Sequence, residues 1–507
     1  MRTVLVANRG EIAVRIIRAC RELGLRTVAV YSDADRDALH PRLADAALPL
    51  GAADPRESYL HIGRLIDAAR ASGADGVHPG YGFLAEHAPF AAAVREAGLT
   101  WVGPPAEVIA RLGDKVAARR EMEKAGVSVV PGYAKPGASD AAIVAAARRI
   151  GAPLLIKAAG GGGGRGMRLI ERLADLQGAL PSARREAGAA FGSDGLLLEK
   201  YLPDVRHIEI QVLADQEGTV RHLGERECSV QRRHQKIVEE SPSPAVTEAL
   251  RERLGKAAVT AATAARYVNA GTVEFLVEPN GRFFFLEMNT RLQVEHPVTE
   301  LTTGVDLVKA QLRIAAGDRL GLKPVEFRGH AIECRIYAED PAREFAPSPG
   351  PILALEEPRG PGIRVDSGLR QGWQVPVAYD PLLAKVIAWD RTRSDTIARL
   401  REALRQYVIL GCGTNLMFLQ DILAHEVFQR GEATTRFLEL HFAGWRPGVD
   451  TRALAVAATA EAIRREAPGL LDSTTGPVRG TTGPAAGVVP LDPWDQVGRW
   501  RMGEGNG

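Results

Sequence analysis

The chain has 507 residues, of which 45% are hydrophobic and 25% are charged, a composition typical of an ordinary globular protein. Its 64 Lys and Arg residues nearly balance its 62 Asp and Glu residues, which argues against a nucleic-acid-binding protein, because such proteins carry a clustered basic excess. No apolar run approaches the roughly 18 residues that a membrane-spanning helix needs, so we expect no membrane contact. At roughly 100–200 residues per domain, the length predicts about three domains.

The cysteines and the first residues bear on the compartment. Cys20, Cys228, Cys334 and Cys412 lie far apart and form no CxxC pair, which argues against structural zinc and favours a reducing, cytoplasmic environment. The short apolar run at residues 4–7 is interrupted by Arg9 and Glu11, so we expect no signal peptide.

The first part of the chain alternates between strand and helix patterns. Strands are predicted at 3–8, 27–31 and 76–78, and apolar residues at helical spacing predict helices over 12–23 and 62–69. Strand–helix alternation at this spacing predicts a parallel sheet with right-handed crossovers. We assign residues 1–113 to this N-terminal domain.

From Asp114 onward the pattern changes to shorter strands. A second domain is predicted over 114–328, a third over 329–446 with short strands to about 390 and then a helix, and a linker-like tail over 447–507. In the second domain we predict strands at 154–157, 167–170, 196–199 and 207–212, and a hairpin of 271–277 with 282–288. Within the tail, residues 451–466 are a candidate helix.

A glycine-rich run separates two of these strands, from Lys157 to Met167. Glycines let backbone N–H groups approach phosphate oxygens closely. The run lacks the Gly-Lys-Ser/Thr of a P-loop and leads into a strand rather than a helix, so it fits neither a P-loop nor a dinucleotide fingerprint. It predicts a flap that closes over phosphates; the alternative is a flexible surface hairpin.

The predicted hairpin places two carboxylates opposite each other. If Asn280-Gly281 forms a two-residue type I′ turn, counting outward pairs Glu274 with Glu287. Two bare carboxylates among apolar neighbours need a cation or a shared proton. Hard oxygen ligands beside a phosphate flap favour Mg²⁺. The alternative is a solvated pair at a sheet edge.

Polar residues continue at every second position after this strand: Glu287, Asn289, Arg291, Gln293 and Glu295. In an extended chain, alternate side chains share one face. This pattern therefore predicts a polar face at a functional site. A third polar segment runs from Glu225 to Lys236 and could also be a basic surface loop; within it, we interpret Cys228 as a small buried thiol.

Several long motifs resemble those of biotin carboxylase, an ATP-grasp enzyme. They occur in order at residues 8–13, 78–83 and 113–115, in the glycine run, and at 231–236 and 287–297. The resemblance covers about residues 1–446. It implies an α/β chain with an ATP-grasp fold, a Rossmann-like N-terminal domain, a glycine-rich lid at about 131–203 and a C-terminal mixed α+β domain. The implied activity is formation of carboxybiotin from ATP, bicarbonate and biotin, through carboxyphosphate.

The resemblance also implies roles for individual residues. It assigns nucleotide binding to Lys115, Lys157, Gly163, Gly164, Met167, Glu199, Lys200, Leu202, His207, Gln231, His234, Glu274 and Glu287. It assigns one or two Mg²⁺ or Mn²⁺ ions to Glu274, Glu287 and Asn289. It assigns bicarbonate to Lys236, Arg291, Gln293, Val294 and Glu295, with Glu295 as general base, and the biotin ureido oxygen to Arg335.

Two other functions remain to be weighed. One is another ATP-grasp ligase that forms an amide or carbamoyl phosphate, and Arg335 and the 231–236 loop argue against it. The other is a catalytically silent nucleotide-sensing subunit, which would be expected to have lost Glu295, Arg291 or Lys236.

The implied partners are a separate biotin carboxyl carrier protein, a second copy of the chain and a carboxyltransferase subunit, like that of the acetyl-CoA carboxylase of fatty acid biosynthesis. The last lysine is Lys385, so no biotinylation site is expected after Trp445. Residues 491–502 weakly resemble a segment of long carboxylase α chains, and we expect them to dock a partner subunit.

Overall fold

The computed structural model describes residues 1–448 except 136, 160–166, 193, 234 and 322–324. The chain divides into two units, Met1–Pro447 and Gly448–Gly507. The candidate helix at 451–466 and the candidate docking segment at 491–502 lie outside the described residues. Among the described helices, none combines the length and apolarity needed to cross a bilayer.

The N-terminal sheet is parallel, with strand order β3-β2-β1-β4-β5. Its strands are β1 (Thr3–Val6), β2 (Arg26–Ser32), β3 (Ala46–Gly51), β4 (Gly76–His78) and β5 (Thr100–Trp101). The helices are α1 (Gly10–Glu22), α2 (Leu39–Leu43), α3 (Ile62–Ser72), α4 (Ala88–Glu96) and α5 (Ala106–Gly113). Helix α1 buries Ile12, Ile16 and Ala19 against the sheet, as their helical spacing predicts. The Rossmann-like prediction is confirmed.

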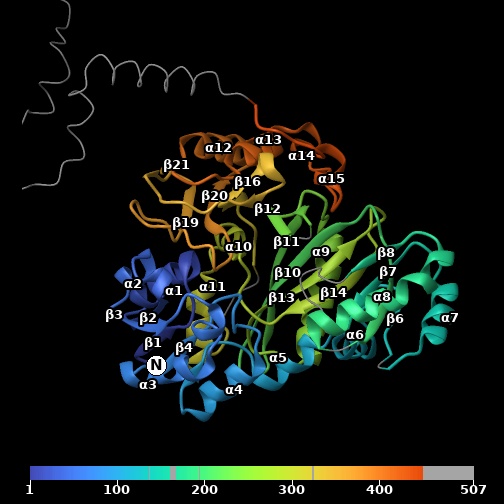
Figure 1. The fold of residues 1–507 in the computed structure, drawn as a ribbon, viewed down its shortest axis with the longest axis horizontal. Coiled ribbons are helices and arrows are strands. Elements are labelled where there is room, and N and C mark those ends of the chain that lie inside the picture. The colour runs from blue at the N-terminus through green and yellow to red at the C-terminus, as the bar shows by residue number, and fades with distance from the viewer. Residues whose placement is uncertain (136, 160–166, 193, 234, 322–324, 449–507) are drawn as a thin grey trace, which may run out of the picture. The chain divides into compact units, whose positions relative to one another are not determined.

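A separate four-stranded antiparallel sheet has the order β6-β9-β7-β8 (Figure 1). Its strands are β6 (Gly132–Tyr133), β7 (Leu154–Ala158), β8 (Arg168–Ile170) and β9 (Leu196–Lys200), and α6 (Lys115–Lys124) precedes it. Helices α7 (Asp140–Ile150) and α8 (Leu173–Phe191) share its apolar core. The glycine run connects β7 to β8, as predicted, but its residues 160–166 lie outside the described part of the chain.

The largest sheet is antiparallel, with eight strands in the order β14-β13-β10-β11-β12-β15-β20-β19. Its strands are β10 (Arg206–Ala214), β11 (Val220–Arg232), β12 (Gln235–Ser241), β13 (Asn269–Val277), β14 (Phe283–Asn289), β15 (His330–Tyr337), β19 (Ile363–Ser367) and β20 (Leu382–Asp390). Because β12 pairs with β15, one continuous sheet crosses the predicted domain boundary at residue 328. This sheet joins residues proposed for two domains on one rigid platform.

Helices cover both faces of this sheet. Helix α9 (Glu248–Ala264) packs on the face that buries Ile208, Ile210 and Val212. Helix α10 (His296–Thr303) lies on the opposite face, and α11 (Leu307–Ala315) packs towards the N-terminal sheet. The remaining elements are β16 (Glu339–Asp340), β17 (Ala346–Pro347), β18 (Ala354–Glu356), β21 (Val408–Leu410), α12 (Arg393–Gln406), α13 (Leu416–Ala424), α14 (Glu426–Gln429) and α15 (Phe437–His441).

The β13–β14 hairpin corrects one prediction. Glu278 N donates to Arg282 O at 2.8 Å, so residues 279–281 form a three-residue loop with Gly281 at φ 78°, rather than a two-residue type I′ turn. The strands near the loop are therefore shifted by one residue, and Phe275 pairs with Phe285. A bulge at Leu286 then restores the pairing of Glu274 with Glu287. The predicted pair is present, although the turn that predicted it is wrong.

Candidate active site

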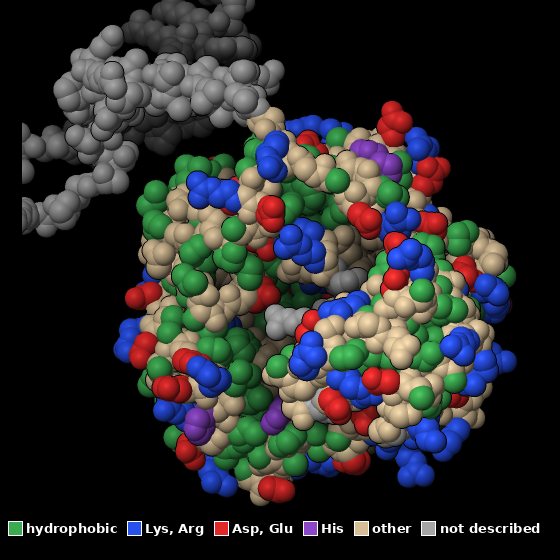
Figure 2. Space-filling model, turned by 45° about the vertical axis from the view of Figure 1, so that its right-hand side comes forward, with side chains coloured by type: hydrophobic (Ala, Val, Ile, Leu, Met, Phe, Trp, Pro, Cys, Tyr) green, Lys and Arg blue, Asp and Glu red, His purple; other side chains and the backbone are tan. Residues whose placement is uncertain are grey.

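The polar side chains gather on one face of the eight-stranded sheet because its strands alternate. On β10, Ile208 and Ile210 point into the core with α9, so His207, Glu209 and Gln211 point to the other face. This alternation explains how buried carboxylates can line a site beside a large hydrophobic core. Figure 2 shows the molecule hollowed near the centre of that view, with Lys and Arg side chains around the hollow.

Lys236 on β12 is the centre of the cluster. Its Nζ donates to three carboxylates: Glu209 Oε2 at 2.5 Å, Glu274 Oε1 at 2.9 Å and Glu295 Oε1 at 2.7 Å. Burial by itself lowers the pKa of Lys236, but these three carboxylates outweigh it and hold the pKa well above its ordinary value. Lys236 is therefore a fixed positive charge with an excess of negative partners.

Glu295 lies between two cations. Its Oε2 accepts from Arg335 Nη2 at 2.9 Å, and its Oε1 accepts from Lys236. Burial by itself raises the pKa of Glu295, but Lys236, Arg335 and Arg226 reverse this and hold the pKa well below its ordinary value. Arg335 also donates from Nε to Glu239 Oε1 at 2.6 Å, so two carboxylates fix the plane of its guanidinium.

Glu274 on β13 accepts from three donors and lies beside His207. His207 Nε2 lies 2.7 Å from its Oε2, and Asn289 Nδ2 and Gln293 Nε2 lie 2.8 and 3.0 Å from its Oε1, which also accepts from Lys236. Burial by itself raises the pKa of Glu274, but Lys236 and His207 lower it below its ordinary value. The carboxylate is thus ionised and oriented by side chains of the protein itself.

The polar run after β14 reaches the site by a different path from the predicted one. The strand ends at Asn289, and Glu295 is already the residue before helix α10, so the chain is not extended throughout. Nevertheless, Arg291 Nη1 donates to Gln293 Oε1 at 2.7 Å and Nη2 donates to Asn289 Oδ1 at 3.2 Å. A turn, rather than one strand face, brings these side chains together.

Sequence reasoning missed Glu86, Glu209 and Arg226. Glu86 accepts from Arg291 Nε at 2.9 Å and from Thr290 N at 2.9 Å, and it lies three residues after the 78–83 motif. Glu209 shares the β10 alternation with His207, which could have revealed it. Arg226 lies within the polar 225–236 segment, where no local pattern distinguishes it from its neighbours.

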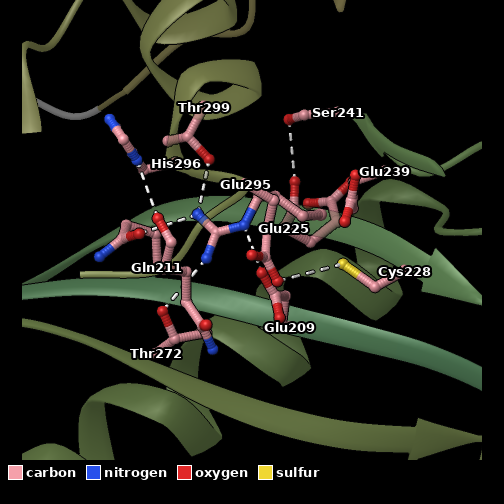
Figure 3. Close-up of polar contacts among 12 residues, drawn as sticks. Glu209, Gln211, Glu225, Cys228, Glu239, Ser241, Thr272, Glu295, His296 and Thr299 are labelled. Carbon is pink, nitrogen blue, oxygen red and sulfur yellow. Dashed lines mark hydrogen bonds and ion pairs between the residues drawn. The ribbon is translucent and has the colours of Figure 1, made fainter. Parts of the chain in front are cut away.

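Arg226 is fully buried beneath the cluster. It contacts Glu209 Oε1 and donates to Gln211 Oε1 at 2.8 Å, Thr299 Oγ1 at 2.9 Å and Thr272 Oγ1 at 3.1 Å. Figure 3 shows Glu209, Gln211, Thr272 and Thr299 gathered from neighbouring strands and α10. This network fixes Glu209, and through it Lys236.

Three family models match consecutive parts of the chain. "Biotin carboxylase, N-terminal domain" matches residues 1–109, "Carbamoyl-phosphate synthase L chain, ATP binding domain" matches 114–323, and "Biotin carboxylase C-terminal domain" matches 333–440. Biotin carboxylase 1 of Bacillus subtilis is 50% identical over 87% of this chain and 99% of its own length. The chain belongs to the biotin carboxylase family. It is an ATP-dependent ligase, and the ATP-grasp prediction is confirmed.

Other relatives support the same family. The biotin carboxylase of Pseudomonas aeruginosa is 50% identical over 86% of this chain and 97% of its own length. The biotin carboxylase domain dimer of Hydrogenobacter thermophilus 2-oxoglutarate carboxylase, solved with MgADP, ADP and bicarbonate, is 46% identical with a TM-score of 0.85, covering 88% of this chain and 99% of that one. The biotin carboxylase of Campylobacter jejuni, solved as a β,γ-ATP complex, is 43% identical with a TM-score of 0.85, covering 87% of this chain and 99% of that one.

In this chain, the predicted nucleotide residues form pairs at both antiparallel sheets. Lys115 Nζ lies 3.2 Å from Glu287 Oε2, and Lys157 contacts Glu199. Lys200 Nζ donates to the carbonyl oxygens of Gly151 and Ala152 at 3.0 and 2.7 Å. The Lys200 ammonium is thus engaged by backbone in this conformation.

The other predicted nucleotide residues vary in how the structure describes them. Gln231 Nε2 lies 2.7 Å from His207 Nδ1, which links two of them. Met167 and Leu202 are half-buried. Gly163, Gly164 and His234 lie outside the described residues. The structure therefore links Gln231, His207 and Glu274 to Lys236.

The predicted metal ligands offer the oxygen donors that Mg²⁺ or Mn²⁺ prefers. Glu274 and Glu287 are paired across β13 and β14, and the Glu287 side chain is 34% exposed and contacts Lys115 through only one of its oxygens. Asn289 lies at the end of the same strand as Glu287, where its Nδ2 donates to Glu274 and its Oδ1 accepts from Arg291. These residues fit a divalent cation bound together with substrate phosphates.

Cys228 lies on β11 at the edge of the cluster. Its Sγ is 4.0 Å from Glu295 Oε1, and it is fully buried. Burial, with Glu209 and Glu295 nearby, holds the pKa of its thiol well above the ordinary value. It therefore stays protonated, which agrees with its interpretation as a small buried thiol.

Proposed function

We propose that this chain carboxylates biotin on a separate biotin carboxyl carrier protein, using ATP and bicarbonate through carboxyphosphate, in the first half-reaction of an acyl-CoA carboxylase. The observation that carries the proposal is the position of Glu295 between Lys236 and Arg335. This places a candidate base between a candidate bicarbonate-binding cation and a candidate biotin-binding cation.

The bicarbonate step uses the Lys236 side of the cluster. Lys236 and Arg291 offer positive charge for the anion, with Gln293 and Val294 beside them, while Glu295 accepts its proton. As bicarbonate oxygen bonds to the γ-phosphorus, ADP leaves and the proton passes to Glu295. An arriving anion competes with Glu295 for Lys236, and this raises the low pKa of Glu295 towards that of a working base.

The biotin step uses the Arg335 side. Arg335 stays protonated and its donors are planar and paired, which suits a ureido oxygen that gains negative charge when the ring nitrogen is deprotonated. Glu239 holds its Nε and Glu295 holds its Nη2, so a bound ureido oxygen shares the guanidinium with the Glu295 carboxylate. The electrostatic demand at this oxygen is the reason for an arginine rather than a lysine.

The nucleotide and metal roles follow the same reasoning. We assign ATP to Lys115, Lys157, Gly163, Gly164, Met167, Glu199, Lys200, Leu202, His207, Gln231 and His234, with Glu274 and Glu287. Glu274, Glu287 and Asn289 would hold the divalent cation, which spreads phosphoryl charge when bound. Lys115 neutralises Glu287 until phosphate arrives, because the two side chains already form an ion pair.

The domain limits remain those read from the sequence: 1–113, 114–328 with a lid at about 131–203, 329–446, and a tail from 447. The ranges of the three family models support them. The proposed partners are a carrier protein, a second copy of the chain and a carboxyltransferase subunit, in the cytoplasm. The solved relative described as a dimer supports the pairing of two copies.

The direct test measures ATP hydrolysis by the purified chain with and without bicarbonate and free biotin. Hydrolysis should require bicarbonate and rise with biotin. Transfer of carboxylate to a separate biotinylated carrier, together with a blank avidin blot of the chain itself, tests action in trans. A biotin-positive band at the chain's own mass would contradict it. The two alternatives predict ATPase that needs an amine or ammonia, or no turnover.

A further inference from the structure

Lys385 is a fully buried lysine behind the proposed site, on β20. Its Nζ donates to the backbone carbonyl oxygen of Val294 at 2.7 Å, and Val294 immediately precedes Glu295. Neither the sequence motifs nor the proposed chemistry gives this lysine a task. Its hydrogen bond to a carbonyl oxygen next to Glu295 suggests that it fixes the backbone there.

Lys385 and Arg335 occupy directly paired positions on β20 and β15. Arg335 donates to the Glu295 carboxylate, and Lys385 donates to the carbonyl of the preceding residue. The two cations therefore hold consecutive residues of one segment from neighbouring strands. This matters because residues 290–295 lie between β14 and α10, where no strand ladder fixes the backbone.

Three carboxyl groups from different elements face Lys385. Glu11 Oε2 of α1 lies 3.5 Å from its Nζ and Asp366 Oδ2 of β19 lies 3.7 Å away, and Glu333 of β15 is a further close neighbour. Burial by itself lowers the pKa of Lys385, but Glu11, Glu333 and Asp366 raise it above the ordinary value, so it stays charged. Glu11 belongs to the 8–13 motif, whose polar residues have no role in the proposed chemistry.

We propose that Lys385 is a positioning residue for Glu295: it fixes the Val294 carbonyl so that the Glu295 carboxylate stays between Lys236 and Arg335, and the Asp366 carboxylate of β19 balances its charge. The inference rests on the proposed role of Glu295 as the base. It also gives the 8–13 motif a function, because α1 reaches the site through Glu11 and Lys385.

The first test is Lys385→Met, which keeps the length of the side chain but removes the donor. A base displaced by about 1 Å loses on the order of 100-fold in rate, so we expect kcat for bicarbonate-dependent ATP hydrolysis to fall about 10- to 100-fold. KM for ATP should change less than about twofold, since Lys385 contacts none of the proposed nucleotide residues.

A double-mutant cycle separates positioning from general stability. If Lys385 acts through Glu295, Lys385→Met should cost no further activity in a Glu295→Gln background, although it should still lower Tm. Multiplicative losses of kcat would overturn the inference. If Glu295→Gln alone retains full bicarbonate-dependent ATPase, the proposed role of Glu295 as the base is wrong. This result is distinguishable from failure of the positioning role, in which the losses of kcat from the two substitutions multiply.

Two further variants separate a loss of positioning from a loss of stability. Arg9→Met removes another buried ion pair of the N-terminal region, in which Arg9 Nε lies 2.6 Å from Asp35 Oδ2, and it should lower Tm without lowering kcat. If Lys385→Met does not fold, the cycle is run with Glu11→Gln added, so that the buried carboxyl opposite no longer needs a cation. Recovery of Tm together with recovery of kcat in that variant would also overturn the positioning role.

Discussion

Arg335 Nη2 and Glu295 Oε2 are joined at 2.9 Å, so the arginine proposed to bind biotin holds the carboxylate proposed to deprotonate bicarbonate. The two half-steps of the reaction are therefore electrostatically linked before any substrate arrives. Loss of either side chain should therefore disturb the other.

Arg335→Ala should abolish carboxylation of free biotin, by at least about 100-fold, because it removes the donors proposed for the ureido oxygen. Slow bicarbonate-dependent ATP hydrolysis should remain. Its acid limb should move to higher pH, because Glu295 loses a cation that lowers its pKa. Parallel measurement of ADP release and carboxybiotin formation checks this; equal loss of both activities in a folded variant would argue against the division of labour.

Glu287→Gln should weaken the use of Mg·ATP rather than folding. The side chain is partly exposed and contacts only Lys115 among the described ion pairs, so its removal costs little stability. Titration of activity against Mg²⁺ and Mn²⁺ should show a several-fold higher metal requirement. A normal requirement with normal turnover would exclude Glu287 as a ligand.

Glu86→Gln should affect bicarbonate more than ATP. Glu86 holds the Nε of Arg291 at 2.9 Å, so the substitution frees a guanidinium that we propose binds the anion. We expect a several-fold rise in KM for bicarbonate and an unchanged KM for ATP. The control is Glu278→Gln, which removes an exposed pairing with Arg282 at the far end of the hairpin and should change neither constant.

The contribution of Glu11 to stability should fall as pH rises from about 5 to 8. Burial raises the pKa of Glu11 to about 7, against attraction by Lys385, so the folded state keeps a proton that the unfolded state releases from about pH 4.5 upward. The raised pKa of Glu11 stabilises the folded state fully below pH 4.5, and this stabilisation is lost as the pH rises through 7. At 1.36 kcal/mol per pKa unit, the free energy of unfolding changes by roughly 3 kcal/mol.

Thermal unfolding of the wild type and of Glu11→Gln from pH 5 to 8 measures this. Between pH 5 and pH 8 the Tm of the variant should fall less, or rise more, than that of the wild type, because the variant carries no titrating carboxyl at that position. Buried Glu239, whose pKa is also raised to about 7, and the buried histidines His40 and His78, whose pKa values are lowered by burial, titrate in both proteins and cancel in the comparison. Identical slopes in the two proteins would contradict the assignment to Glu11.

The sequence predicted most of the regular elements because their hydrophobic spacing is local information. The β1–α1–β2 unit and β4 lie where that spacing placed them. The hairpin loop was mispredicted because Asn280-Gly281 favours a two-residue turn, while a three-residue loop and a bulge at Leu286 give the same Glu274–Glu287 pairing. Turn preference alone could not distinguish the two.

The site was predictable where a motif, the hairpin register or the family resemblance marked it. Lys236, Arg291 and Glu295 fall in motifs, Glu274 follows from the hairpin pairing and Arg335 from the resemblance, and the structure brings them together. Lys385 and Glu86 act through contacts with residues more than ninety positions away along the chain, and no local pattern reveals such contacts. The single sheet that joins β12 to β15 was missed for the same reason.

Labelled bicarbonate tests directly whether Glu295 is the base: its incorporation into free biotin is measured with the wild type and with Glu295→Gln, and ADP release is followed in the same reaction. With the wild type we expect label in biotin and biotin-stimulated ADP release. We expect loss of both, by at least about 100-fold, in a Glu295→Gln variant that retains ATP binding. Undiminished labelling by Glu295→Gln, or ADP release that ignores bicarbonate in the wild type, would contradict this mechanism.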